Sequence, residues 1–330
     1  MDLRKRLARL DRLTRPPSAA DAAPAPAIGR RGDPATVLGA LGFTPDATPT
    51  GPVWRLEVTR EHVPRPTGPV PDLAGILPAG TPAGLDWSDV LLVDTETTGL
   101  AGGTGTLAFL VGLAWWDGTD FRVRQLFLPA PGTEAPLLAD LEELARGFRV
   151  VATYNGAGFD LPLLRTRARL ARRADPLAGL VGWDLLVAAR RCWGRGLVDC
   201  RQQTVERLVC RRERGTGDIA GALIPAVYQR YLAGEQAPEL AAVLRHNRRD
   251  MDGLGLVLAA LAVEARAARR TPGDAPGRGD TVGCWSRALI AEFQQDGTLR
   301  TATPERADAV LHVTLETFDL EPLRSDEDNP

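Results

Sequence analysis

The chain has 330 residues, of which 44% are hydrophobic, and its formal net charge is −2. This length and composition predict a soluble globular protein with a core of one large domain or two smaller ones. No apolar run approaches the ~20 residues that a membrane span needs, and the first residues, MDLRKRLARLDRL, lack the apolar centre of a secretory signal. We therefore expect a cytoplasmic protein with no membrane partner.

The charges are unevenly distributed along the chain. Residues 161–215 carry thirteen arginines and five acids, whereas residues 301–330 carry eight acids and two arginines. Guanidinium groups suit contact with phosphate, so the basic segment is compatible with nucleic-acid binding. A bias toward arginine across the whole chain explains it equally well. The four cysteines show neither a CxxC pair nor zinc-finger spacing, which argues against a disulfide framework or structural zinc.

The first part of the chain is rich in proline, alanine and glycine. Residues 1–36 are predicted to be a disordered extension with a short helix at its start, and residues 37–86 a loosely structured lead-in with one strand, VWRLEV. From residue 87 the pattern changes. The runs VLLVD, TLAFLVGLAWW and FRVRQLFL predict three strands in hairpin succession.

Helices dominate the predicted elements that follow. We expect a helix over 134–148, a buried strand at VVATYN, and helices over 160–174, 181–193, 204–209, 222–234 and 238–270. The order of elements predicts an α/β domain over 87–265, followed by a linker over 266–280. Residues 281–330 are predicted to form a C-terminal extension with a short helix, a strand and an acidic tail.

Two carboxylates stand where the run VLLV ends. Residues two apart in a strand project from the same face, so Asp94 and Glu96 present their oxygens to one point. Such close carboxylates repel each other unless divalent cations neutralise them. Hard oxygen ligands without accompanying His or Cys favour Mg²⁺ or Mn²⁺ over zinc. A strand end exposed to water is the alternative.

Two further segments carry candidate residues. In TYNGAGFDLPLL, Asp160 begins a predicted helix, where it is either a site residue or an ordinary helix cap. In RHNRRDMDGL, His246 and Asp250 lie four residues apart on a predicted helix and therefore on one face. Asp250 suits a metal ligand, and His246 suits a proton acceptor near neutral pH. A surface or satisfied interior histidine is the alternative.

Taken together, the three segments resemble the DEDD exonucleases of the ribonuclease-H-like superfamily. DTETTGL is similar to their first motif, and YNGAGFDLPLL to their second as found in proofreading domains of family B polymerases. GGTGTLAFLVGLAWW, DCRQQTVERLV, GDIAGALIPAVYQRYL and HNRRD further resemble the YprB type of this domain, from about Trp87 to Ala262. The resemblance implies a mixed sheet, with an antiparallel meander and parallel strands, flanked by helices.

The resemblance also implies a mechanism and its residues. Two Mg²⁺ or Mn²⁺ ions would be held by Asp94, Glu96, Asp160 and Asp250. His246 would be the general base, although it precedes Asp250 by four residues, where the histidine subclass has five. Residues expected to contact the substrate are Thr97, Thr98, Leu100, Tyr154, Asn155 and Arg165. Asp184 is expected to cap a helix and Asp218 to order a loop.

The implied activity is metal-dependent 3′–5′ hydrolysis of single-stranded DNA or RNA. Two alternatives stay open at the level of sequence: a non-catalytic nucleic-acid-binding module of the same fold, and an endonuclease of the same superfamily. Retention of all four acids counts against a pure binding module, because a cluster of negative charge would repel phosphates. Whether the acidic tail recruits a protein partner is left open by the sequence.

Overall fold

The computed structural model describes residues 33–66, 70, 76–99, 104–215, 217–235 and 238–269, and side chains only as far as residue 265. The predicted helix at the start of the chain lies outside these ranges, as do the predicted helix, strand and acidic tail after residue 280. The domain boundaries stay a prediction.

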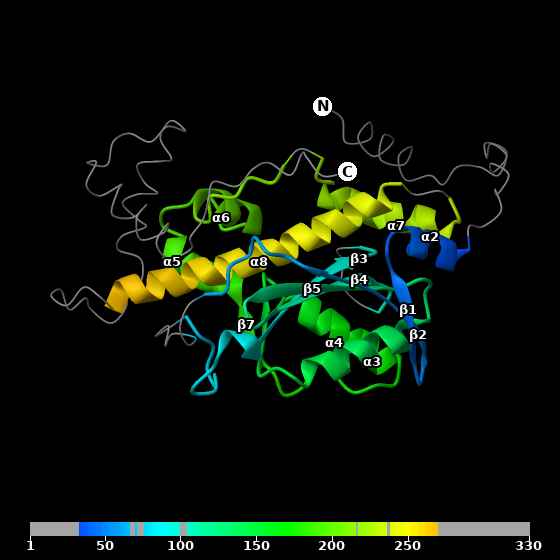
Figure 1. The fold of residues 1–330 in the computed structure, drawn as a ribbon, viewed down its shortest axis with the longest axis horizontal. Helices are drawn as coiled ribbons and strands as arrows, with labels where there is room; N and C mark the ends of the chain where they lie inside the picture. Colours follow the sequence, from blue (N-terminus) through cyan, green and yellow to red (C-terminus); the bar gives the residue numbers. More distant parts are fainter. Residues whose placement is uncertain are drawn as a thin grey trace, which may run out of the picture.

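The described chain is built around a mixed sheet of seven strands in the order β1-β2-β5-β4-β3-β6-β7 (Figure 1). The strands are β1 (Thr44–Thr48), β2 (Gly51–Thr59), β3 (Val90–Thr97), β4 (Ala108–Asp117), β5 (Asp120–Phe127), β6 (Val150–Thr153) and β7 (Val181–Asp184). Strands β3, β4 and β5 form the predicted antiparallel meander, and β6 and β7 continue the sheet in parallel with β3. The predicted α/β mixed sheet is confirmed.

Helices flank this sheet. They are α2 (Pro34–Ala40), α3 (Glu134–Ala145), α4 (Asp160–Leu170), α5 (Leu185–Trp193), α6 (Gln202–Leu208), α7 (Ile224–Leu232) and α8 (Leu240–Arg269), with short 3₁₀ turns at Trp87–Asp89 and Gly221–Leu223. Figure 1 shows α3 and α4 on one side of the sheet and the long α8 crossing the other. No helix in the described ranges has both the length and the apolar character needed to cross a bilayer.

Strand β3 is buried on both faces because helices cover both sides of the sheet. Leu91 and Val93 pack in the same cluster as Leu163 of α4, whereas Leu92 packs in the same cluster as Leu254 of α8. Since strand side chains alternate between faces, the residues that follow inherit this division. Even-numbered residues of β3 face α8, and odd-numbered ones face α4.

Two expectations about secondary structure were wrong. The predicted strand VWRLEV is confirmed as part of β2. However, residues 44–59 form the hairpin β1–β2 and β2 pairs antiparallel with β5, so this part of the segment predicted as a loosely structured lead-in is an integral part of the sheet. The predicted helix over 181–193 divides into β7 and α5, because residues 181–184 pair in parallel with β6. Asp184 ends the strand and accepts from the Leu186 N–H as the N-cap of α5, which confirms its predicted capping role.

Candidate active site and metal centre

The first two acids lie on the α8 side of β3, as their two-residue spacing requires. Asp94 is opposite Gly112 of β4 in the sheet register. Asn247 of α8, which is fully buried, donates from Nδ2 to Asp94 Oδ2 at 2.9 Å. A Cβ at position 112 would lie 2.5 Å from Asn247 Oδ1, so glycine is needed there for α8 to approach. Gln125 completes the contact by donating to Asn247 Oδ1 at 2.9 Å.

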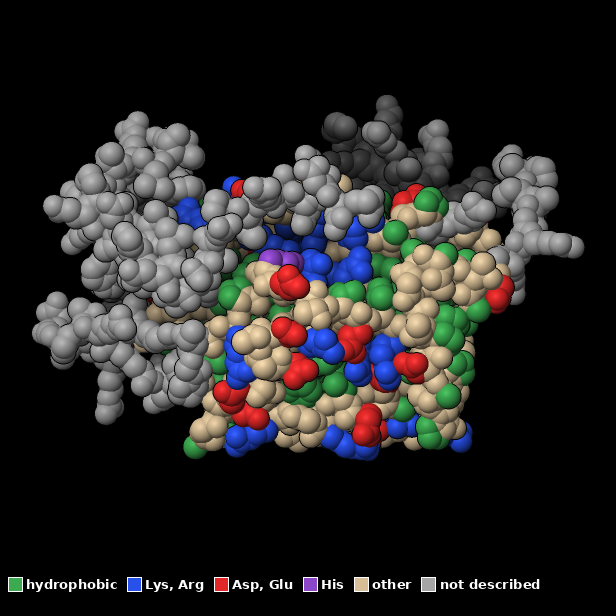
Figure 2. Space-filling view, in the orientation of Figure 1, with side chains coloured by type: hydrophobic (Ala, Val, Ile, Leu, Met, Phe, Trp, Pro, Cys, Tyr) green, Lys and Arg blue, Asp and Glu red, His purple; other side chains and the backbone are tan. Residues whose placement is uncertain are grey.

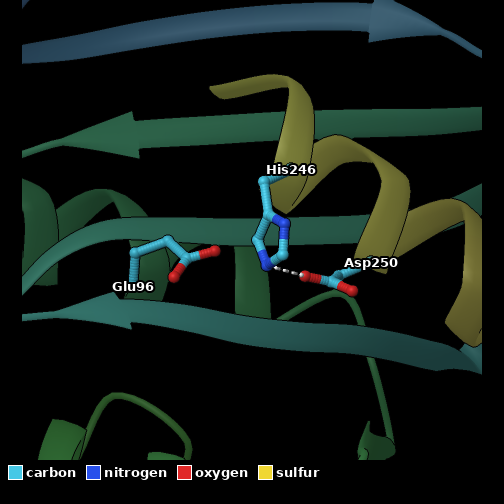
Figure 3. Close-up of side chains that lie close together, drawn as sticks. All are labelled: Glu96, His246 and Asp250. Atoms are coloured by element: carbon cyan, nitrogen blue, oxygen red, sulfur yellow. Dashed lines mark ion pairs between the residues drawn. The ribbon is translucent and has the colours of Figure 1, made fainter. Parts of the chain in front are cut away.

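Glu96 meets two residues of α8. Ligand atoms of Glu96, His246 and Asp250 all lie within 4.8 Å of one another. Figure 3 shows the Glu96 carboxylate directed toward the imidazole, with Asp250 on the opposite side of the ring. His246 Nε2 is 3.1 Å from Asp250 Oδ2, which follows from their four-residue spacing on one helix face. This cluster brings together residues that are 154 positions apart in the sequence.

Asp160 reaches the site from the other side of the sheet. It begins α4, as predicted, and its side chain is buried with 7% relative exposure. The Thr95 hydroxyl, on the α4 face of β3, donates to Asp160 Oδ1. The second carboxylate oxygen is not held by that bond. The compact cluster consists of Glu96, His246 and Asp250. Asp94 and Asp160 are its acidic neighbours, close enough for charge repulsion to act between them and Glu96.

Burial and repulsion both disfavour ionised carboxylates here. Burial raises the pKa of Asp94 well above its ordinary value, and Asp250 and Glu96 raise it further. Burial also raises the pKa of Glu96, to about 8, followed by repulsion from Asp250 and Asp160. The pKa of Asp160 is raised, chiefly by burial. The site is short of positive charge, and a bound cation would relieve that shortage.

The loop after α6 supplies the arginine that meets this cluster. Arg214 donates to Asp250 Oδ1 at 2.5 Å. It also holds the fully buried Glu206 through two hydrogen bonds, of 2.9 Å from Nε and 2.6 Å from Nη2. Its pKa is raised above the ordinary value by these two acids, against the opposing effect of burial. Arg214 therefore fixes the position of one Asp250 oxygen.

Asp218 does more than order its own loop. Its Oδ1 lies 2.9 Å from His246 Nδ1 and 3.6 Å from Arg249 Nη1. Although burial acts in the opposite direction, the hydrogen bond with His246 is the main cause that lowers the pKa of Asp218. An ionised carboxylate on Nδ1 fixes the orientation of the imidazole and directs Nε2 toward Asp250. Sequence reasoning missed this contact, and it missed Arg214 and Asn247 as neighbours of the acids.

The residues expected to contact substrate differ in their surroundings. Thr97 donates from its hydroxyl to the Gly99 carbonyl at 2.9 Å, and the Thr98 Oγ accepts from the Leu107 N–H at 3.0 Å, so both shape the turn after β3. Leu100 lies outside the described residues. Asn155 is exposed, has a positive φ of 64°, and donates from its backbone to Asp184 at 2.9 Å.

Two of the expected substrate residues are engaged elsewhere. The Tyr154 hydroxyl donates to the Cys200 carbonyl at 2.6 Å, and burial is the main cause that raises its pKa. Arg165 is half exposed on α4, and its Nε pairs with Asp175 at 2.8 Å.

Comparison with known proteins places this geometry in context. Residues 91–262 match the family model described as the RNase_H superfamily. A Bacillus subtilis (strain 168) protein, "Uncharacterized protein YprB", is 36% identical over 178 residues, which cover 53% of this chain and 41% of that protein. The match thus spans less than half the length of that relative.

Among solved structures, the family B DNA polymerase of Pyrobaculum calidifontis aligns with a TM-score of 0.40 and 17% identity. The alignment covers 66% of this chain and 33% of the polymerase.

Proposed function

The chain belongs to the RNase_H superfamily, and from this premise we propose that it is a metal-dependent 3′–5′ exonuclease of the DEDD type that acts on single-stranded DNA or RNA. The observation that carries the proposal is the cluster of Glu96, His246 and Asp250 within 4.8 Å. It lies beside Asp94 and Asp160, whose pKa values are also raised.

The donor set suits hard divalent cations. Asp94, Glu96, Asp160 and Asp250 would hold two Mg²⁺ or Mn²⁺ ions, because carboxylate oxygens are the ligands that these ions prefer. The raised pKa values of three of these groups support the fit, since buried acids that repel one another gain most from a bound cation. Such cations supply activation of a water and stabilisation of the leaving 3′ oxygen.

The chain's own residues contribute orientation and proton transfer. In the proposed reaction Asp250 Oδ2, which lies 3.1 Å from His246 Nε2, would turn to a cation and release that nitrogen. His246 then accepts a proton from the attacking water at Nε2, while Asp218 holds Nδ1 at 2.9 Å. A positioned general base contributes ~10²–10⁴-fold to a hydrolysis rate. Arg214 and Asn247 hold Asp250 and Asp94, and the rigid placement of these carboxylates reduces the reorganisation needed at each turnover.

The proposed substrate contacts are retained with one exception. Thr97, Thr98, Leu100 and Asn155 stay as candidates for the terminal nucleotide. Arg165 would have to exchange Asp175 for a phosphate. The Tyr154 hydroxyl is omitted from the proposal because it is bonded to the Cys200 carbonyl.

Purified protein with Mn²⁺ on 3′-labelled, 5′-labelled and circular single strands tests the proposal. The 3′ label is expected to leave as a mononucleotide at once, the 5′-labelled strand to shorten stepwise, and circles to stay intact. Asp250→Asn should abolish cleavage, whereas Asp117→Asn, at an exposed position on β4, should not. Internal nicks in circles would indicate an endonuclease, and binding without any cleavage would indicate a non-catalytic module.

A further inference from the structure

A group of arginines lies on the side of α8 that faces away from the sheet. Figure 2 shows arginine and histidine side chains gathered over this helix. Arg245 and Arg248 are three residues apart and Asp252 follows at the seventh position, so the three share one helix face. Arg245 is exposed and Arg248 half-buried. We call Arg245 and Arg248, with Arg60 and Arg249 beside them, the α8 arginine patch.

Acids do not balance the charge of the patch. Asp252, with no exposed side-chain surface, is paired with Arg60 at 2.8 Å, with Arg212 at 3.2 Å and with His62 at 3.0 Å. Within the described ranges, Arg245 and Arg248 form no ion pair with an acid at 4.0 Å or less. One carboxylate thus serves two guanidinium groups and an imidazole, and Arg245 and Arg248 have no direct acidic partner among the described residues.

The cost of this crowding is visible at Arg248. Burial lowers the pKa of this guanidinium from its ordinary value, and the positive charges of Arg60 and Arg245 lower it further, whereas Asp252 acts in the opposite direction. Like charges held together with too few counter-charges repel one another, and a bound anion relieves that repulsion. Arginine is suited to phosphate because its planar fork donates two parallel hydrogen bonds.

The patch lies near the candidate site but is distinct from it. At 3.6 residues per turn, the face of Arg245 and Arg248 is rotated roughly 150° from that of His246 and Asp250. Arg249 lies between the two faces, where its Nη1 is 3.6 Å from Asp218 Oδ1. A helix with its side chains is about 10–12 Å across, so one helix diameter separates the patch from the carboxylates.

We propose that the α8 arginine patch binds backbone phosphates of the nucleic-acid strand outside the cleavage site. The identity of this ligand rests on the proposed function: a strand held at the carboxylates and continuing along α8 would meet Arg249, which lies between the two faces, and then Arg245. Contacts of this kind carry no base specificity and position the strand. They differ from the arginines of α4, which lie on the other side of the sheet (Figure 1).

The test compares the native 330-residue chain with R245Q/R248Q. The matched control is R146Q/R149Q, which also removes two positive charges. The side chains of Arg146, at the end of α3, and Arg149, just before β6, are 63% and 44% exposed. Fluorescence anisotropy with a labelled single-stranded oligonucleotide in EDTA, from 50 to 200 mM salt, gives the dissociation constant and its salt dependence without cleavage. Mn²⁺-dependent hydrolysis of thymidine 5′-p-nitrophenyl phosphate, too small to reach the patch, monitors the carboxylate site.

R245Q/R248Q is expected to bind more weakly and to lose about 1.4 from the slope of log affinity against log salt, since each single-strand phosphate contact contributes about 0.7. Over this fourfold range of salt, its affinity should fall about sevenfold less than that of the native protein. Hydrolysis of the small ester and the behaviour of the control should be unchanged.

Equal salt slopes for the two double variants would overturn the inference and leave the nuclease proposal intact. The inference also fails if the native protein binds no oligonucleotide yet hydrolyses the ester. Absence of Mn²⁺-dependent hydrolysis in the native protein, with binding that still depends on Arg245 and Arg248, would instead refute the nuclease proposal and support the patch.

Discussion

Replacing Glu96 by glutamine tests whether the carboxylate cluster is a destabilising feature that a cation compensates. The Glu96 side chain has 9% relative exposure, and its pKa is raised from 4.5 to about 8. Between these two values the folded chain binds the proton that the unfolded chain has released, so stability falls as pH rises. At about 1.36 kcal/mol per pH unit, Glu96 costs the metal-free protein up to ~3 kcal/mol at pH 7.

The glutamine variant removes this cost. Without metal, Glu96→Gln is expected to raise the free energy of unfolding at pH 7 by up to ~3 kcal/mol, equivalent to roughly 6–12 °C in Tm for a folded unit of this size. Near pH 4.5 the difference should disappear. Added Mn²⁺ should then stabilise the native protein more than the variant, because the variant lacks one ligand.

Differential scanning calorimetry in EDTA and in Mn²⁺, at pH 4.5 and pH 7, measures both effects. Glu143→Gln is the control, since the side chain of Glu143 is 74% exposed and lies outside the site. If Glu96→Gln is no more stable than the native protein in EDTA at pH 7, or if Mn²⁺ stabilises both equally, Glu96 does not belong to a cation-binding cluster.

Three other substitutions probe the surroundings of the cluster. Gly112→Ala would place a Cβ 2.5 Å from Asn247 Oδ1, and the overpacking should lower the free energy of unfolding in urea by about 1–3 kcal/mol. Arg214→Met leaves the fully buried Glu206 without its bidentate partner, so a loss of about 3–5 kcal/mol is expected in the same assay. Asp218→Asn should lower kcat, by up to the ~10²–10⁴-fold that a general base supplies, with little change in KM on a labelled strand.

Each of these expectations has a matched comparison. Gly105→Ala introduces a Cβ with no atom within 4 Å, so an equal effect at Gly112 would contradict the close approach of α8. Arg207→Met, at an exposed position on α6, should be nearly neutral, and an equally small effect at Arg214 would argue against a buried ion pair. An unchanged kcat in Asp218→Asn would remove the orienting role of that carboxylate.

Long, strongly patterned segments were predictable from sequence, and short edge segments were not. The runs VLLVD and TLAFLVGLAWW became β3 and β4, because strands buried on both faces require continuous apolar character. The alternating run FRVRQLFL became β5, whose side chains are alternately buried and partly exposed over residues 121–125. The four residues of β7 are too few to show a period, and they were assigned to the helix that follows them. Hairpin β1–β2 joins the sheet through pairing with β5, about 70 positions away, and local pattern contains no information on that partner.

The sequence by itself determined that Asp94 and Glu96 share a face and that His246 and Asp250 share another, since strand and helix periods are fixed by backbone geometry. Only the tertiary structure decided that these two faces meet. It also decided that Thr95 holds Asp160 on the other face of β3. The loop after α6 brings Arg214 to Asp250 and Asp218 to His246. Periodicity orients side chains about one element, whereas contacts between elements depend on how α8 packs over the sheet.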